Sequence, residues 1–273
     1  LGDLPALVQE GGWTLDAMQS MMQTSTHDLN GDGIMDKEDQ YGISGAVQLE
    51  YGALISGAGI RYIERDTDGK LFFNIPGNEN AINVMQKVFD LHTTDTYVNF
   101  MTSFHATDFD FFMNGHSMLF ASSIKHIERF RDLDANIGYL PIPKYSEDQK
   151  DYHCLSAGGA VAVIPITVPA ENLEPIGLIL EALSFASNKE LLPVYIEETL
   201  KTKYTRDEDS VKMMEIILNS SFYDLGVSVW QSATQSYVME QIYLPMKDVI
   251  ASTIASMTNK VESEIAAVTE VQE

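Results

Sequence analysis

The sequence predicts a helix-rich α/β fold, and three observations support this prediction. Strand-like runs alternate with helical patterns over much of the chain, which is typical of α/β proteins. Residues 158–164 form a continuous apolar run, as expected for a strand buried on both faces. Beyond residue 165 the pattern is mostly helical. With 273 residues, of which 45% are hydrophobic, the chain can bury a sizeable core and form one or two domains.

The charge balance narrows the possible partners. The chain has 40 Asp and Glu residues against 17 Lys and Arg, which gives a net charge of −23. Phosphate backbones and anionic membrane surfaces repel such a chain, so nucleic acid is excluded as a partner. The single cysteine, Cys154, rules out an intrachain disulfide and fits either a cytosolic or an exported protein.

The first helix is predicted to begin at Thr14, which can cap it, with Asp16 in the first turn, where the helix dipole favours negative charge. Trp13, beside this helix start, is expected to pack structurally. An acidic loop follows, and then residues 40–44 are expected to form a short strand. Residues 48–57 look helical.

The middle of the chain continues the alternation. Residues 61–75 read as a hairpin around Asp68-Gly69, and residues 78–92 as a helix with a broad apolar face. A short helix is expected to end at Asn114-Gly115, and a strand to follow at 117–121.

The second half begins with a short strand and a proline-rich exit at 136–144 and a polar connection up to residue 156. The apolar strand at 158–164 comes next. A helix over 172–187 is expected to face inward with Ile176, Ile179, Leu180 and Leu183. Further helices are predicted over 189–200, 207–219 and 233–265, the last packing through Ile250, Ile254 and Met257.

The acidic loop has the spacing of a calcium site. Asp28, Asn30, Asp32, Gly33, Asp36 and Asp39 fall at positions 1, 3, 5, 6, 9 and 12 of an EF-hand loop, in the dockerin-type variant that ends in Asp. The backbone carbonyl of Ile34 would be a further ligand. Because a strand and not a second helix follows, we expect a structural Ca²⁺ that fixes the turn of the chain. The alternative is a solvated acidic turn.

The order of these features resembles the later part of an extracellular solute-binding protein of a bacterial ABC importer, of the carbohydrate-binding type. The matching pieces are "GGWTLDAMQSM", "YGALISGAGIRYIERDTDGKLFFN", "FFMNGHSMLF", "IGYLPIPK" and "GGAVAVIPITVPAENLEPIGLILEALSF". The acidic loop and "TLKTKYTRDEDSVKMMEIIL" look most like lipoprotein members of that family.

The resemblance implies a periplasmic-binding-protein-like fold of type II, with a second lobe and a partial first lobe. Residues 1–145 would form the second lobe, 146–203 the hinge and a remnant of the first lobe, and 204–273 a helical return. Roughly a hundred residues of the first lobe would be missing. The implied protein is a monomer that is anchored outside the cell as a lipoprotein and delivers a sugar or oligosaccharide to an ABC permease.

The resemblance also suggests which side chains contact the sugar. Aromatic rings stack on the apolar faces of sugars, and polar groups fix the hydroxyls. The aromatic candidates are Tyr51, Tyr223 and Trp230. The hydrogen-bonding candidates are Ser122 and Ser123, with Asp110 as a weaker one. The alternative is that these aromatic residues belong to the core.

The sequence favours binding over catalysis, because it lacks the H-E-x-x-H, G-x-S-x-G and P-loop motifs, and no cysteine pair accompanies its six histidines. The alternatives are a carbohydrate-active enzyme, which paired carboxylates leave open, and a dockerin-like module. A true dockerin would carry two such loops. A third alternative is an interaction domain that uses the acidic surface.

Overall fold

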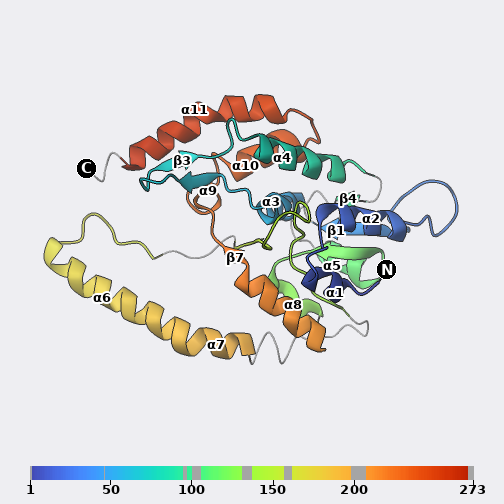
Figure 1. Cartoon of the computed structure of the whole chain (residues 1–273), viewed down its shortest axis with the longest axis horizontal. Helices are drawn as coiled ribbons and strands as arrows, with labels where there is room; N and C mark the ends of the chain where they lie inside the picture. The colour runs from blue at the N-terminus through green and yellow to red at the C-terminus, as the bar shows by residue number, and fades with distance from the viewer. Residues whose placement is uncertain are drawn as a thin grey trace.

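The computed structural model describes residues 2–45, 47–94, 97–99, 106–130, 137–156, 162–197 and 207–269. Over these residues the protein is a helix-rich, mixed α/β structure with small sheets, as the sequence predicts (Figure 1). The helices are α1 (Leu4–Gln9), α2 (Leu15–Ser25), α3 (Val47–Gly57), α4 (Glu79–His92), α5 (Ala106–Met113), α6 (Ala170–Ala186), α7 (Leu192–Val194), α8 (Glu208–Asn219), α9 (Leu225–Ser228), α10 (Gln235–Val238) and α11 (Ile250–Thr269), with the shorter helical turns η1 (Ile124–Phe130), η2 (Ser187–Leu191) and η4 (Met239–Tyr243). The strands are β1 (Tyr41–Gly45), β2 (Ile63–Arg65), β3 (Leu71–Phe73), β4 (Tyr97–Asn99), β5 (Ser117–Ala121), β6 (Cys154–Leu155) and β7 (Ser221–Phe222).

The largest sheet has three parallel strands in the order β4-β1-β5. Successive residues of β1 face opposite sides of this sheet. The ring of Tyr41 lies 6.1 Å from that of Phe111 on α5. Gly42 faces α2, where a Cβ would collide with the backbone of Met22, so glycine permits this close approach. The helices α2 and α5 therefore cover the two faces, and the three strands end at one edge.

Several predicted boundaries are confirmed by local contacts. Thr14 caps α2, since its Oγ1 accepts a hydrogen bond from the amide of Ala17 at 3.2 Å. Asn78 caps α4 in the same way. The predicted hairpin is the antiparallel pair β2 and β3. Trp13 is buried, and its Nε1 donates to the carbonyl of Pro141 at 2.8 Å, which gives it the structural role that the sequence predicts.

One hydrophobic core runs through the structure from Val8 to Ile265. It joins α2, α3 and α4 to α9, α10 and α11, and we call residues 2–155 and 225–269 the main body. The last helix buries a stripe of residues on this core: Ile250, Ile254, Met257, Val261 and Ile265. The predicted inward side of this helix is thus confirmed.

Two predicted elements are wrong. The single helix expected over 233–265 is interrupted, because Pro245 has no amide to continue the hydrogen-bond ladder and Met246 adopts a φ of 50°. No strand forms over 137–144, where Lys144 makes only an isolated bridge to Thr14.

Between the two parts of the main body the chain makes an excursion, which we define as residues 156–224. The chain leaves and re-enters the main body at neighbouring positions. It leaves at β6 and returns at β7, which pair in parallel and have two residues each. The amide of Cys154 donates to the carbonyl of Ser220 at 3.0 Å, and the amide of Ser156 to that of Phe222 at 2.8 Å. We call this pair the crossing point.

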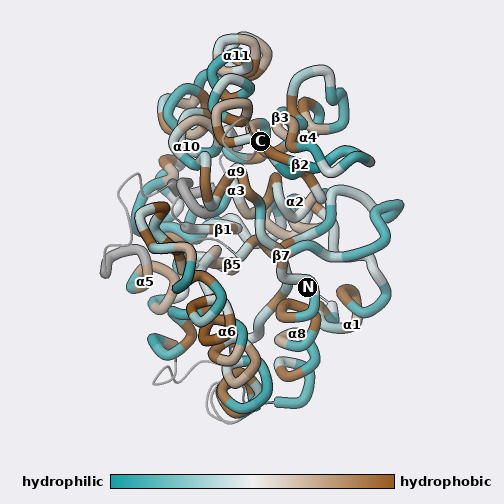
Figure 2. Tube along the Cα trace, turned by 90° about the vertical axis from the view of Figure 1, so that its left-hand side faces the viewer, coloured by the Kyte–Doolittle hydropathy of each residue, from teal (hydrophilic) through white to brown (hydrophobic). Residues whose placement is uncertain are grey.

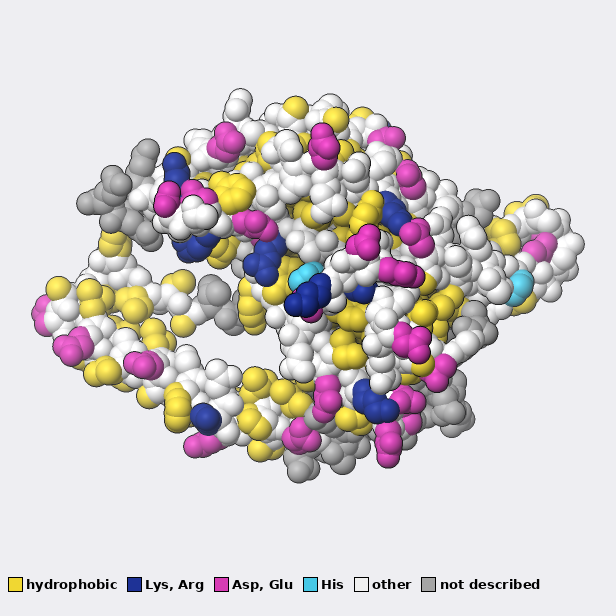
Figure 3. Space-filling model, viewed as in Figure 1, with side chains coloured by type: hydrophobic (Ala, Val, Ile, Leu, Met, Phe, Trp, Pro, Cys, Tyr) yellow, Lys and Arg dark blue, Asp and Glu magenta, His cyan; other side chains and the backbone are white. Residues whose placement is uncertain are grey.

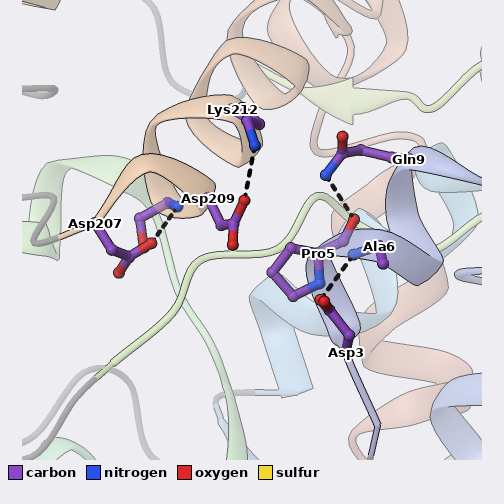
Figure 4. Close-up of polar contacts among 8 residues, drawn as sticks. Asp3, Pro5, Ala6, Gln9, Asp207, Asp209 and Lys212 are labelled. Atoms are coloured by element: carbon purple, nitrogen blue, oxygen red, sulfur yellow. Dashed lines mark hydrogen bonds and ion pairs between the residues drawn. The ribbon is translucent and has the colours of Figure 1, made fainter.

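The returning helix α8 packs on the main body, since it contacts α1 and its Met213 is buried in the main core. Asp3 caps α1 and Asp207 caps α8, each accepting a backbone amide bond (Figure 4). A hydrogen bond to Asp209 raises the pKa of Lys212 on the same helix. This end of the excursion is therefore well anchored.

The rest of the excursion stands away from the main body. We call residues 162–197, which include α6 and α7, the apolar arm (yellow in Figure 1). No residue of α6 is buried. The exposed large hydrophobic residues of the arm are Val163, Ile164, Ile166, Leu173, Leu178, Ile179, Leu183, Phe185, Leu191, Leu192, Val194 and Tyr195. Figure 2 shows the hydrophobic colouring along α6, and Figure 3 shows openings that pass between the arm and the main body.

The arm contradicts two expectations. The inward face expected on the helix over 172–187 has nothing to cover among the described residues. The apolar run at 158–164 forms no strand where it is described, over 162–164, because no strand edge lies beside it there; its first residues lie outside the described ranges. Among the described residues of the arm, Ile196 at its end packs with Ile127 and Met214.

Candidate ligand-binding site

The carboxyl edge of the three-stranded sheet is the first part of the candidate site. Ligands of open parallel α/β sheets bind outside the carboxyl ends of the strands. Ser122 and Ser123 directly follow β5 at this edge, and both are exposed. The Oγ of Ser122 lies 3.0 Å from Nδ1 of His126. The two predicted serines are therefore placed where hydroxyls could meet a solute.

His126 adds an aromatic and polar group to this edge. Its ring meets the ring of Phe109 edge-on, with centroids 5.4 Å apart. Partial burial lowers the pKa of His126, and the charges of Lys125 and Arg129 lower it further. The imidazole is thereby biased toward its neutral form, which can both donate and accept a hydrogen bond.

Glu50 is a polar residue at this edge that sequence reasoning missed. It lies in the first turn of α3, just after β1, and its side chain is 1% exposed. A Cβ at Gly45 would lie 3.0 Å from its Oε2, so the carboxylate reaches the end of β1. The sequence signal that could have identified Glu50 as a site residue is its position in the first turn of a helix that directly follows a strand.

The crossing point forms the second part of the candidate site. The guanidinium carbon of Arg61 lies 4.7 Å from the centroid of the Phe222 ring. His153 meets the same ring edge-on at 5.9 Å. The next residue, Tyr223, is 66% exposed. Burial lowers the pKa of His153, and the charge of Arg61 adds to this effect.

Tyr223 is thus the predicted aromatic residue with an exposed ring. Arg61 and His153 contact the ring of Phe222, the residue that precedes it in the chain. Sequence reasoning missed these three because they come from segments far apart in the chain. No local pattern joins residue 61 to residues 153 and 222.

The structure corrects the roles of Tyr51 and Trp230, which both lie in the main core. Tyr51 is fully buried, and its ring stacks on that of Tyr243 with centroids 4.3 Å apart. Its hydroxyl donates to the carbonyl of Gln235 at 2.6 Å, and burial raises its pKa well above the usual range. Neither ring is open to a ligand. Asp110 is exposed on α5.

The acidic loop adopts a tight turn held by its own carboxylates. Asp28 accepts hydrogen bonds from the amides of Gly31 at 2.6 Å and Gly33 at 2.8 Å. Gly33 has a φ of +80°, which only glycine adopts readily. Asp32 accepts from the amide of Ile34 at 2.8 Å. The glycine at the sixth position therefore makes the turn that the predicted loop needs.

Asp39 closes this loop from the inside. Its side chain is buried, and it accepts from the amides of Asp36 at 2.8 Å and Leu29 at 2.9 Å. These backbone bonds, first of all that from Asp36, lower its pKa.

The donor set of the loop is made of oxygens, as calcium prefers. Within the described ranges, however, no three or more His, Cys, Asp or Glu side chains converge to hold a metal ion. The carboxylates of Asp28 and Asp39 instead face backbone amides.

Comparisons with known proteins give a likeness of fold and no family. No protein-family model matches the chain, and no curated protein matches it. Its structure is similar to the crystal structure of M. tuberculosis UspC, with a TM-score of 0.55 and 16% sequence identity. The match covers 90% of this chain and 64% of the UspC chain, so the chain spans less than two thirds of that structure.

These findings correct the family resemblance drawn from the sequence. Assignment to the carbohydrate-type extracellular binding proteins, as a lipoprotein member with a dockerin-like loop, is wrong, because no family model matches. The comparison with solved structures supports an α/β fold similar to that of UspC. Among the helices that the structure describes, none combines the length and apolar character needed to cross a membrane.

Proposed function

We propose that this chain is part of a two-lobed solute-binding protein that captures a sugar or oligosaccharide for an ABC permease. Residues 1–145 and the helical return over 204–273 would form one lobe of type II, and residues 146–203 would form the hinge and part of the other lobe. In this role the protein works outside the membrane as a monomer, and it breaks no bond.

The observation that carries this proposal is the crossing point. The chain leaves the main body at β6 and returns at β7, and these strands are direct neighbours. Two adjacent short connections between lobes are what a hinge requires, and hinge closure around a ligand is the motion of periplasmic binding proteins. The likeness of fold to UspC supports the α/β architecture on which this arrangement depends.

The candidate site fits capture between two lobes. The exposed ring of Tyr223 can stack on a sugar, and the hydroxyls of Ser122 and Ser123 can hydrogen-bond to it. Arg61 and His153 add donors beside the crossing point. Closure would bring such groups around the ligand and exclude water from it.

The proposal is tested by screening mono- and oligosaccharides against the whole product of the gene, by thermal shift and by release of reducing sugar. We expect binding without turnover. Tyr223→Ala should weaken binding about 3- to 10-fold, the worth of one stacked ring. The matched control is Phe72→Ala, a partly exposed aromatic residue on β3, which should bind as the unaltered protein does.

Two results would contradict the proposal. Release of reducing sugar would favour the carbohydrate-active enzyme. Failure of every sugar to shift the melting temperature would remove the capture role.

We also propose that the acidic loop binds a structural Ca²⁺. The support is the oxygen donor set at EF-hand spacing and the turn at Gly33. Asp28, Asn30, Asp32, Asp36 and Asp39 would supply side-chain oxygens, and Ile34 its backbone carbonyl. The ion would neutralise the crowded carboxylates and stiffen the link between α2 and β1.

A further inference from the structure

A groove of about 390 Å³ lies between η4 and α11 on the main body, and we call it the α11 groove. Its walls come from α10, η4, the turn that follows η4 and the first turns of α11. Figures 1 and 2 both show α11 at the top of the molecule, away from β7. None of its lining residues belongs to the carboxyl edge or the crossing point, so it is separate from the candidate ligand-binding site. Its volume falls within the range of roughly 300–1,000 Å³ that is common for small-molecule sites.

Thr253 is the residue of the α11 groove that points to a ligand. Its side chain lines the groove, and the residue is 5% exposed. Among the residues that the structure describes, its Oγ1 has no hydrogen-bond partner, whereas Oγ1 of Thr258 on the same helix donates to the carbonyl of Ile254 at 2.7 Å. The Thr253 hydroxyl is not sealed off from solvent, so it opens onto the groove. A ligand that hydrogen-bonds to it would make a bond that the fold leaves unmade.

Three further hydroxyls line the same groove. Oγ of Ser256 donates to the carbonyl of Thr253 at 2.8 Å and lies 3.2 Å from the hydroxyl of Tyr237. Oγ of Ser252 donates to the carbonyl of Val249 at 3.0 Å. Each of these oxygens keeps a lone pair that can accept a further hydrogen bond. The groove therefore offers several polar contacts close to Thr253.

The charges of the α11 groove favour a neutral ligand. The lining includes one side chain of each sign, Glu240 and Lys247, so it has no net charge. An isolated anion would meet the carboxylate of Glu240, and an isolated cation the ammonium group of Lys247. Ligand hydroxyls can donate to the first and accept from the second. The apolar parts of Tyr237 and Pro245 supply surface for the carbon skeleton of such a ligand.

We propose that the α11 groove binds a neutral polyhydroxyl compound, either a free polyol or one ring of a saccharide. The hydroxyl of Thr253 is its central contact. This inference does not depend on the two-lobed arrangement, because every lining residue belongs to the main body.

The backbone at the end of the groove is consistent with a binding site. Met246, between the lining residues Pro245 and Lys247, has a φ of 50°, which is uncommon for a residue other than glycine. The preceding turn, η4, is a π-helix. Both features occur often at functional sites, where surrounding contacts hold an otherwise unfavourable geometry.

The experiment measures binding of xylitol, glucose and maltose to the whole product of the gene by isothermal titration calorimetry, with inorganic phosphate as a charged probe. Thr253→Val removes the hydroxyl and keeps the shape of the side chain. Because this hydroxyl has no partner in the described part of the chain, the melting temperature of the variant should not fall. The matched control is Thr258→Val, on the same helix but outside the groove.

We expect at least one of the three neutral compounds to bind, and Thr253→Val to weaken that binding about three- to tenfold, the worth of one hydrogen bond. Thr258→Val and Tyr223→Ala should leave it unchanged. Preference for xylitol would identify a free polyol, and preference for glucose or maltose a saccharide.

Three results would overturn the inference. These are absence of binding at high millimolar concentrations, binding that Thr253→Val does not weaken, and binding of phosphate in preference to the neutral compounds. Sugar binding that is lost in Tyr223→Ala but kept in Thr253→Val would exclude the α11 groove and leave capture at the crossing point intact. The reverse pattern would support the groove and count against Tyr223.

Discussion

Asp224 shows how one buried carboxylate can organise several segments. It is 1% exposed and accepts hydrogen bonds from the amides of Tyr62 at 2.7 Å and Gly226 at 2.7 Å. Burial raises its pKa, although these backbone bonds oppose the shift. The residue caps α9 and joins it to the start of β2, next to the crossing point.

Replacing Asp224 with alanine should lower the free energy of unfolding by about 2–4 kcal/mol, because buried amides lose a charged acceptor. Urea denaturation measures this change. Asp148→Ala is the matched control: Asp148 is exposed, so we expect a change within about 0.5 kcal/mol. Equal effects of the two variants would show that Asp224 is not a structural acceptor.

His92 is a second buried residue with a measurable consequence. Its Nδ1 donates to the carbonyl of Val88 at 2.6 Å, and burial lowers its pKa from 6.5 to about 4. The unfolded chain therefore binds a proton at a higher pH than the folded chain does. Neutral His92 therefore makes its full contribution to the free energy of unfolding above about pH 6.5, and this contribution is lost as the pH falls toward 4.

The variant His92→Asn keeps a donor for Val88 and does not titrate. The unaltered protein should lose about 3 kcal/mol from this residue between pH 6.5 and pH 4, and the variant should not show this part of the slope. His92→Phe serves as a second non-titrating variant, and the exposed His27→Asn as the control. Unchanged slopes in both His92 variants would contradict the assignment.

At the scale of elements, two carboxylates of the acidic loop should differ in what they contribute: Asp39 to the stability of the fold, and Asp32 to calcium binding. Asp39 holds the loop through bonds to the amides of Leu29 and Asp36, whether or not an ion is present. Asp32 is exposed, and it accepts hydrogen bonds from its near neighbours in the loop, the amide of Ile34 and the side chain of Asn30. Their substitutions should therefore differ in how they respond to calcium.

Millimolar Ca²⁺ added to the chelated protein should raise the melting temperature by about 5 °C or more, as expected for an ion in hundredfold excess over its dissociation constant. Asp32→Ala should abolish this rise. Asp66→Ala, in the turn between β2 and β3, is the matched control and should keep it. Asp39→Ala should lower stability even without calcium. Absence of any rise in the unaltered protein would leave the loop a solvated turn.

The elements that the sequence predicts correctly are those whose signals are local. Thr14 and Asn78 mark helix starts by their own hydrogen bonds, and β5 follows a glycine turn at Gly115. The helix that the sequence predicts over 233–265 runs through Pro245 without a break. There the break in backbone hydrogen bonding outweighs the pattern.

Site residues were harder to predict because burial is decided by distant segments. Tyr51 and Tyr223 look alike in sequence, yet one stacks on Tyr243 in the core and the other is 66% exposed. The pairing of Arg61 with Phe222 likewise depends on the meeting of two segments that are far apart in the chain. The apolar side chains of α6 are exposed among the described residues, and the sequence pattern does not show what would cover them.

At the scale of the whole molecule, stability should be unevenly distributed. The main core includes residues of α2, α4 and α11, whereas α6 contributes none. Local opening is easiest where few apolar contacts must be broken.

Hydrogen exchange of residues 1–273, followed by mass spectrometry, should therefore show two classes of peptide. Amides of α6 should exchange orders of magnitude faster than those of α4 and α11. Equal protection of α6 and α4 in residues 1–273 would show that the arm is stabilised without a partner.

The small size of the crossing point has a mechanical consequence. Two pairs of residues, tied by the amides of Cys154 and Ser156, form the whole ladder there. A ladder with so few bonds can bend through small changes in backbone torsion. Because Met213 of α8 is buried in the main core and α8 contacts α1, a movement at this joint also has to keep or break those contacts. In the two-lobed arrangement that we propose, contacts with the ligand would therefore have to offset that cost to hold the molecule shut.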